Sequence, residues 1–323
     1  MKLSMLALLA SGLTVAAVTD EQITRNFNVQ PGGRVVVDVD FGSIEISTNA
    51  TSQVTIDIVR KVTRRNKADE ENFLREHPVT FSQDGNTVTV SSKAKTKSNH
   101  WWRGNQRTEA KYTLTVPAQF NAQVKSAGGG IAVSDLTGEV KADTSGGGFK
   151  FARLHGNLNG ETSGGSIHVM ECEGSLKVNT SGGGIDVSGG SGTLDGGTSG
   201  GSVHVRDFRG PTHVETSGGG ITLENVSGRI QGSTSGGSIS ARIASPVSEE
   251  VKLETSGGGV TVQVPDGSAF NLDAETSGGG VSSELPVAVV GKVEGNSLKG
   301  AVNGGGKRVF LRTSGGSIHV RKI

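Results

Sequence analysis

The motif Thr-Ser-Gly-Gly recurs through the last two-thirds of this 323-residue chain, mostly at a spacing of 18 residues. The copies at that spacing begin at Thr144, Thr162, Thr180, Thr198, Thr216 and Thr234, preceded by a degenerate copy at Ser126. Later copies begin at Thr255, Thr276 and Thr313, after steps of 21, 21 and 37 residues. A fixed period of this size indicates a solenoid, in which neighbouring turns bury a face that one turn cannot bury alone.

The same period places apolar residues in columns. Ile, Val or Phe stands five residues after each threonine, and an aliphatic residue usually stands four residues before it. Each turn therefore predicts two short strands, with like residues of successive turns about 4.8 Å apart. The threonines share the phase of the apolar residues, so we expect their hydroxyls to face inward. The corner glycines should supply backbone angles that other residues avoid, and Gly183→Val should then destabilise the stack by strain.

Composition favours a thin, repetitive β architecture. The chain contains 51 Gly but only 7 Pro and 1 Cys, which excludes a collagen helix and a disulfide scaffold. Before the repeat, segments such as 34–39, 43–46, 54–58 and 111–116 alternate apolar and polar residues as strands do, and 67–77 predicts one short helix. We predict an all-β protein with a small N-terminal β domain at 18–125 and a single-chain β-solenoid of 18-residue coils at 126–323.

Residues 1–17 predict a signal peptide. Lys2 is followed by an uncharged run, and Val15-Ala16-Ala17 offers small residues for cleavage before Val18. The run is short for a membrane span, and no later stretch is apolar and long enough to cross a bilayer. The chain holds 32 basic and 31 acidic residues, without the basic excess of a nucleic-acid-binding protein. We therefore expect a protein exported to the periplasm, the cell surface or the medium, neither integral to the membrane nor bound to nucleic acid.

Both tryptophans lie in one loop of a basic stretch between two predicted strands. This loop contains the candidate partner-binding residues His100, Trp101, Trp102 and Arg103. Exposed Trp beside Arg suits a sugar face, a lipid headgroup or a protein partner. The alternative is that one Trp covers the sheet and the other shields the helix.

Metal and cofactor chemistry finds weak support in the sequence. His168, Asp186 and His204 share one outward column on three successive turns, where they form either a metal site or a solvated ladder. The glycine-rich corners lack the lysine of a phosphate-binding loop, and they lack the regular aspartate of a calcium-binding roll. Cys172 takes an apolar place in its column, which predicts a buried, inert thiol. We predict no metal and no cofactor.

Catalytic residues are not singled out by the repeat. Its acidic residues do not form the paired, inward cluster of carboxylates that a glycoside hydrolase needs, and no Ser-His-Asp arrangement stands out. The sequence therefore predicts a protein that is not an enzyme.

The chain resembles a bacterial family of exported repeat proteins named "putative adhesin", largely a domain of unknown function. The resemblance rests on the following segments: 112–117 leading into 124–131, the Thr-Ser-Gly-Gly copies, 302–306, and 311–318. It covers about residue 30 to the C-terminus. It implies a non-enzymatic, adhesin-like binding scaffold of the cell envelope, with a β-solenoid surface for a glycan, lipid or protein. Two alternatives stay open: an envelope-stress regulatory protein with a membrane partner, and a carbohydrate-active enzyme on a solenoid.

Overall fold

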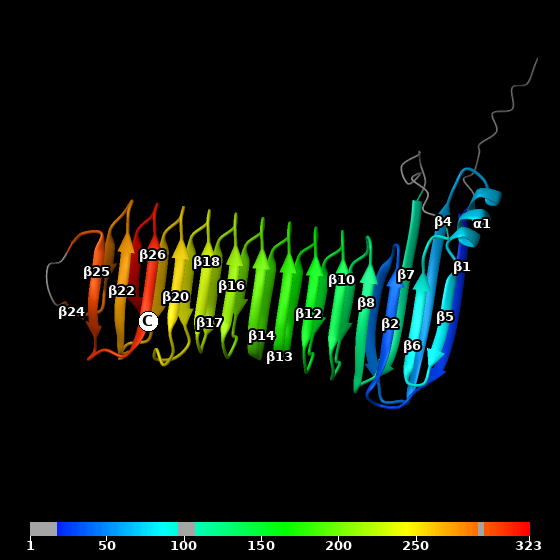
Figure 1. The fold of residues 1–323 in the computed structure, drawn as a ribbon, viewed down its shortest axis with the longest axis horizontal. Coiled ribbons are helices and arrows are strands. Elements are labelled where there is room, and N and C mark those ends of the chain that lie inside the picture. Colours follow the sequence, from blue (N-terminus) through cyan, green and yellow to red (C-terminus); the bar gives the residue numbers. More distant parts are fainter. Residues whose placement is uncertain (1–17, 96–106, 290–293) are drawn as a thin grey trace, which may run out of the picture.

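The protein is a long stack of strands with a helix near one end (Figure 1). The computed structural model describes residues 18–95, 107–289 and 294–323. Within these residues all 27 strands join one continuous sheet, and α1 (Lys67–Glu76) is the one helix. The prediction of an all-β solenoid is confirmed.

Each coil of the middle section gives one strand to each of two parallel ladders. The threonine ladder contains β8 (Phe120–Ser126), β10 (Val140–Thr144), β12 (Leu158–Thr162), the second halves of β13 (Ile167–Thr180) and β14 (Ile185–Thr198), β16 (Thr212–Thr216), β18 (Ile230–Thr234) and β20 (Val251–Thr255). The opposite ladder contains β9 (Ile131–Ser134), β11 (Phe149–Ala152), the first halves of β13 and β14, β15 (Val203–Arg206), β17 (Ile221–Val226), β19 (Ile239–Ile243) and β21 (Val260–Val264). From Thr144 to Thr234 the register steps by 18 residues, as predicted.

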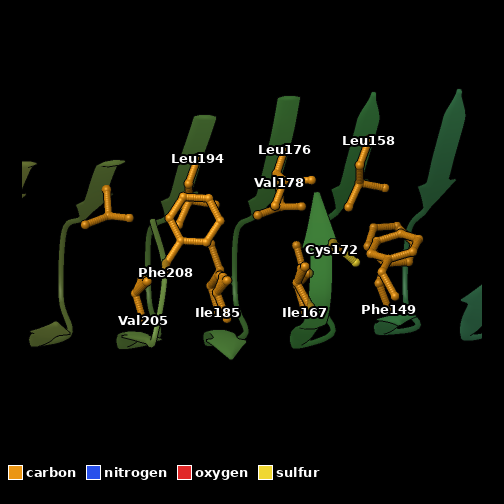
Figure 2. Packing of buried hydrophobic residues seen from close by; sticks show 14 of the residues in the cluster. Phe149, Leu158, Ile167, Cys172, Leu176, Val178, Ile185, Leu194, Val205 and Phe208 are labelled. Atoms are coloured by element: carbon orange, nitrogen blue, oxygen red, sulfur yellow. The ribbon is translucent and has the colours of Figure 1, made fainter. Parts of the chain in front are cut away.

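The core lies between the two ladders. Leu158, Leu176 and Leu194 from the threonine ladder face Ile167 and Ile185 from the opposite ladder (Figure 2). One apolar cluster extends along the whole rod, from Val29 near one end to Val320 near the other. Because each side chain packs on its counterparts in the adjacent coils, burial is shared between neighbours.

The repeated threonines face inward, as predicted. Thr180 is 5% exposed, and its hydroxyl donates to the carbonyl oxygen of Gly165 in the preceding coil at 2.8 Å. The same hydroxyl accepts a hydrogen bond from the Gly183 amide of its own corner at 3.3 Å. Thr180 thus ties its own corner to the corner before it.

The predicted reason for the second corner glycine was wrong. Gly183 is not among the glycines with left-handed backbone angles. A Cβ at this position would lie 2.3 Å from the carbonyl oxygen of Gly165, so the close approach of the adjacent coil excludes a side chain. The glycines at the other corner do need their backbone freedom, since φ is +149° at Gly138 and +104° at Gly228.

The parallel ladders continue toward the N-terminus without the motif. β2 (Gly33–Val39) lies between β8 and β6 (Thr87–Ser92), and β3 (Ser43–Asn49) lies between β9 and β7 (Arg107–Pro117). The outermost strands are antiparallel: β5 (Val79–Asp84) pairs with β6, β4 (Gln53–Thr63) with β7, and β1 (Val18–Asn28) with β4. The helix begins after Asn66, whose side chain accepts from the Asp69 amide. The domain boundary at residue 126 stays a prediction, while the pairing of strands crosses it.

At the C-terminal end the last coil is inserted between two earlier ones. β26 (Lys307–Thr313) lies between β20 and β22 (Phe270–Thr276), and β27 (Ile318–Lys322) lies between β21 and β23 (Val281–Ser283) (Figure 1). β25 (Ser297–Val302) then pairs antiparallel with β22 and with the short β24 (Val287–Ala288). The step of 37 residues to Thr313 therefore reflects an excursion to the end of the rod and back.

Candidate binding grooves on the outer faces

The larger candidate site is an open groove on the outer face of the threonine ladder, with a volume of about 570 Å³. We call it the corner groove. One wall is a column of residues that each precede a corner, on five adjacent strands: Asp38, Lys125, Asp143, Glu161 and Asn179. Corner serines of successive coils, Ser145, Ser163 and Ser181, also line it. With each 18-residue coil the groove therefore gains two polar groups: the side chain of the column residue and the hydroxyl of the corner serine.

The charges in the corner groove fall into two groups: the ion pairs of Lys93, and three side chains without an ion-pair partner among the described residues, Lys125, Asp143 and Glu161. Lys93 pairs with Asp38 at 2.7 Å and with Asp40 at 3.2 Å. Partial burial opposes the charge of Lys93, but its hydrogen bonds and the charges of the two aspartates raise its pKa above the ordinary value. Asp143 and Glu161 have no ion-pair partner among the described residues. These two carboxylates therefore remain available to a ligand.

A second groove, with a volume of about 450 Å³, lies on the outer face of the opposite ladder. Arg206, Glu224 and Arg242 occupy register neighbours on β15, β17 and β19 and line this groove. Asn225 closes one side and donates to Asp207 at 2.6 Å. The pairing register of β17 with β19 shifts between Glu224 and Val226, where the coil lengthens. This groove therefore lies where the cross-section of the rod changes.

The candidate partner-binding residues His100, Trp101, Trp102 and Arg103 lie outside the described residues. Their role stays a prediction. The described chain enters this segment after β6 and leaves it at β7, and Lys93 of the corner groove directly follows β6.

The structure brings the predicted metal column together as register neighbours. His168, Asp186 and His204 lie side by side on β13, β14 and β15, with the outer face of the sheet open before them. Asp186 pairs with Arg206 at 3.3 Å. Within the described residues no group of three His, Cys, Asp or Glu side chains could hold a metal ion. The three side chains are therefore register neighbours in a ladder, in which Asp186 is engaged by Arg206.

Cys172 is buried in the core, as predicted (Figure 2). Burial raises the pKa of its thiol, which favours the protonated form over the reactive thiolate. The Sγ atom donates to the carbonyl oxygen of Met170 at 3.4 Å. This thiol is a packing group.

The adjacency of Asp143 and Glu161 is not among the predictions from the sequence. Those predictions concerned an inward cluster of acids, whereas these two residues are register partners on the outer face. The signal was available, because both residues directly precede a repeated threonine and so share a column.

Comparison with known proteins places the chain among repeat proteins whose biological role is not defined. The family model described as Toastrack DUF4097 matches residues 34–321. No curated protein matches the chain in sequence. No helix of the described residues is long and apolar enough to cross a membrane.

Several solved structures resemble the chain at low identity. A Parabacteroides distasonis protein described as a "putative lipid binding protein" is 13% identical, with coverage of 93% of this chain and 96% of that one and a TM-score of 0.41. A Bacteroides fragilis "putative adhesin" is 12% identical, with coverage of 93% and 97% and a TM-score of 0.35. A Clostridium sporogenes "putative cell adhesion protein" is 13% identical, with coverage of 94% and 100% and a TM-score of 0.23.

Proposed function

The chain belongs to the Toastrack DUF4097 family, and from that premise we propose that it is an exported, non-enzymatic scaffold that binds a cell-envelope glycan along its corner groove. Export rests on the predicted signal peptide at residues 1–17. The single observation that carries the proposal is the groove itself, in which polar groups recur on successive coils at the same height.

The chemistry of the groove suits a ligand rich in hydroxyl groups. Carboxylates accept hydrogen bonds, the amide of Asn179 both donates and accepts, and the corner serines do both as well. A sugar hydroxyl can therefore find a partner whichever role it takes. Adjacent coils are about 4.8 Å apart, so a ligand that repeats along its own length can meet equivalent groups several times.

The setting of the two free carboxylates favours binding over hydrolysis. A glycosidase needs one carboxyl group that stays protonated, because apolar surroundings or a neighbouring carboxylate raise its pKa, so that it can act as the acid. Asp143 is only half-buried and Glu161 is exposed, on an open face. This open setting favours contact with a ligand.

The groove proposal is tested with the double variant Asp143→Asn and Glu161→Gln, which keeps shape and removes both charges. We expect binding to an array of envelope glycans to weaken at least ~10-fold, because charged acceptors make stronger hydrogen bonds than amides. The matched control is Asp195→Asn with Glu215→Gln, two acids on the same ladder outside this groove. Equal loss in both double variants would contradict the assignment of the groove.

The same glycans must also be examined for cleavage. Turnover that disappears with either single carboxylate change would replace the scaffold with a carbohydrate-active enzyme. Binding to lipid vesicles without glycan, unaffected by the groove variant, would instead favour a lipid partner at another surface.

We propose the Trp101–Trp102 loop as a second binding element of the same scaffold. Replacing both tryptophans by alanine should weaken binding and leave the melting temperature nearly unchanged. A large drop in melting temperature would show instead that the pair belongs to the core.

A further inference from the structure

The N-terminal end of the rod presents a long strand edge. β1 has 11 residues and, among the described strands, pairs only with β4 (Figure 1). The opposite ladder ends at the other end of the rod in β23, which has 3 residues, and the hairpin there includes β24 with 2. Short strands are a common way to blunt an edge, whereas a long unpaired edge can accept another strand.

The inner side of this end is incompletely covered by the described residues. Ile23 and Phe27 of β1 and Val79 and Phe81 of β5 are only partly buried against the core. The rings of Phe27 and Phe81 lie 6.3 Å apart, and the Arg25 guanidinium lies 5.7 Å from the centre of the Phe81 ring. An added strand beside β1 would cover these partly buried apolar side chains as well as the unpaired backbone groups of the edge.

The sequence of β1 is complementary to itself. Consider a symmetric antiparallel pair of β1 strands whose twofold axis is normal to the sheet. Residues that face each other across the pair have their side chains on the same face of the sheet. Because side chains alternate between the faces, the numbers of two facing residues must add to an even total. When residues 18–28 overlap fully, Ile23 faces Ile23 of the second copy and Glu21 faces its Arg25. No like charges then face one another. Shifting the pair by one even step in either direction loses both Glu–Arg pairs.

Glu21 and Arg25 are suited to such a contact. One oxygen of Glu21, Oε2, binds the buried Arg60, and its other oxygen has no partner among the described residues. Arg25 is exposed, and its Nη1 atom donates to the carbonyl oxygen of the neighbouring Thr24 at 2.8 Å. α1 contacts β1 through the bond from Thr19 to Glu70, near one end of the strand, whereas the pairing is centred on Ile23.

We propose that β1 is a dimerisation edge, at which two copies of this chain join by antiparallel β1–β1 pairing in the register centred on Ile23. The two rods then meet at their N-terminal ends, and each copy keeps its grooves on the outer faces. This inference is independent of the glycan proposal, because it concerns a different surface. A dimer with two grooves would bind a repeating ligand more tightly than either copy alone.

The first test measures the mass of the exported, processed protein in solution by light scattering over a concentration series. We expect a dimer, and Arg25→Glu should raise its dissociation constant about 10-fold, since two attractive pairs become two repulsive ones. Arg25→Lys keeps the charge and should keep the dimer. The melting curve of each monomer serves as the folding control. A wild-type protein that stays monomeric throughout the series would overturn the proposal.

The second test determines the register with single cysteines. In the proposed register residue 23 faces its own counterpart, so Ile23→Cys should form a disulfide-linked dimer on mild oxidation. Thr19→Cys and Phe27→Cys face each other across the pair, so neither should cross-link alone, and a mixture of the two should. Cys172 is buried and does not interfere. A dimer that none of these cysteines links would show that another surface holds the two copies.

Discussion

The middle of the rod and its two ends use the same coil but connect it differently. From β8 to β21 chain order equals stacking order, and most threonine hydroxyls bond a glycine 15 residues earlier in the chain. At the C-terminal end Thr313 reaches back 55 residues to Gly258, and at the N-terminal end Ser126 reaches back 84 residues to Gly42. The corner motif therefore allows a coil to stack on another coil with the same kind of corner. It does not determine which coil of the chain becomes that neighbour.

This difference predicts unequal cooperativity along the rod. Each middle coil pairs with the coil that directly precedes it in the chain, so few residues separate the strands that must come together. The inserted coils, β2–β3 and β26–β27, must pair on both sides with strands that are distant in the chain. Such long closures are slow, and we expect the ends to complete their pairing after the middle.

The largest effect should come from a side chain placed at a middle corner. A Cβ at Gly147 would lie 2.2 Å from the carbonyl oxygen of Gly129, so Gly147→Ala forces two coils apart. We expect a loss of about 3 kcal/mol in the free energy of unfolding, measured by denaturant titration. Gly146→Ala is the matched control, because its Cβ would meet the nearest atom at an ordinary 3.6 Å. Equal effects at the two positions would show that the corner is not tightly stacked.

A smaller loss should follow removal of one inward hydroxyl. Thr198→Val keeps the shape but leaves the Gly183 carbonyl without its 2.7 Å bond and the Gly201 amide without an acceptor. We expect about 2 kcal/mol of destabilisation. Hydrogen exchange should then rise in the coils on both sides of Thr198. The equivalent Thr313→Val should raise exchange only at the C-terminal end, and a uniform rise in both variants would contradict the nearest-neighbour picture.

The repeat made the middle coils predictable residue by residue. Ile167, Ile185 and Val203 share a column in the sequence and are buried neighbours in the structure. The helix was predicted at 67–77 and is observed at Lys67–Glu76, because Asn66 caps its beginning and Pro78 follows its end.

The ends could not be predicted from the period. The β2–β3 coil turns through Asp40, Phe41 and Gly42, which do not resemble the motif, so it looked like ordinary β structure. Thr255, Thr276 and Thr313 belong to one column, but a column does not order its members in space. The carboxylates of the corner groove could be predicted from the sequence, because they share one column of the repeat. The groove itself could not, because it also needs β2 and Lys93, which only the tertiary pairing of strands places beside that column.

A third prediction concerns the ion pairs that hold the inserted β26. Burial alone would raise the pKa of Asp273, but the hydrogen bond from Arg308 and the charges of Lys299, Arg308 and Arg312 lower it below the ordinary value. Hydrogen bonds from Arg312 and Lys299 also lower the pKa of Glu275. A carboxyl whose pKa is lower in the folded state stabilises the fold above its unfolded pKa of about 4. That contribution is lost as the pH falls through the folded pKa.

Acidification below about pH 4 should therefore loosen the C-terminal end before the middle coils. The measurement is hydrogen exchange along the rod as a function of pH, with β26 compared with β16. Asp273→Asn should remove about 1 kcal/mol of this end's stability at neutral pH and flatten its pH dependence. If β16 and β26 lose protection together, the ion pairs do not hold the inserted coil separately.

The smallest expected effect is an increase in the free energy of unfolding, caused by a substitution in the middle of the rod. Glu171 has φ of +53°, in a column where the next coil has Gly189 with φ of +73°. Left-handed backbone costs a non-glycine residue about 1–2 kcal/mol, and glycine costs about 0.5–1 kcal/mol in unfolded-chain entropy. Glu171→Gly should therefore stabilise the protein by about 0.5 kcal/mol in denaturant titration, since no hydrogen bond or ion pair of the described residues holds the Glu171 side chain and only the charge of the exposed Arg153 acts on it. In Arg153→Gly, with φ of +51°, the same relief is offset by the lost pair to Asp135 at 2.5 Å, so little net change is expected. A loss of stability in Glu171→Gly would mean that the side chains of this column, rather than its backbone angles, set the energy of the corner.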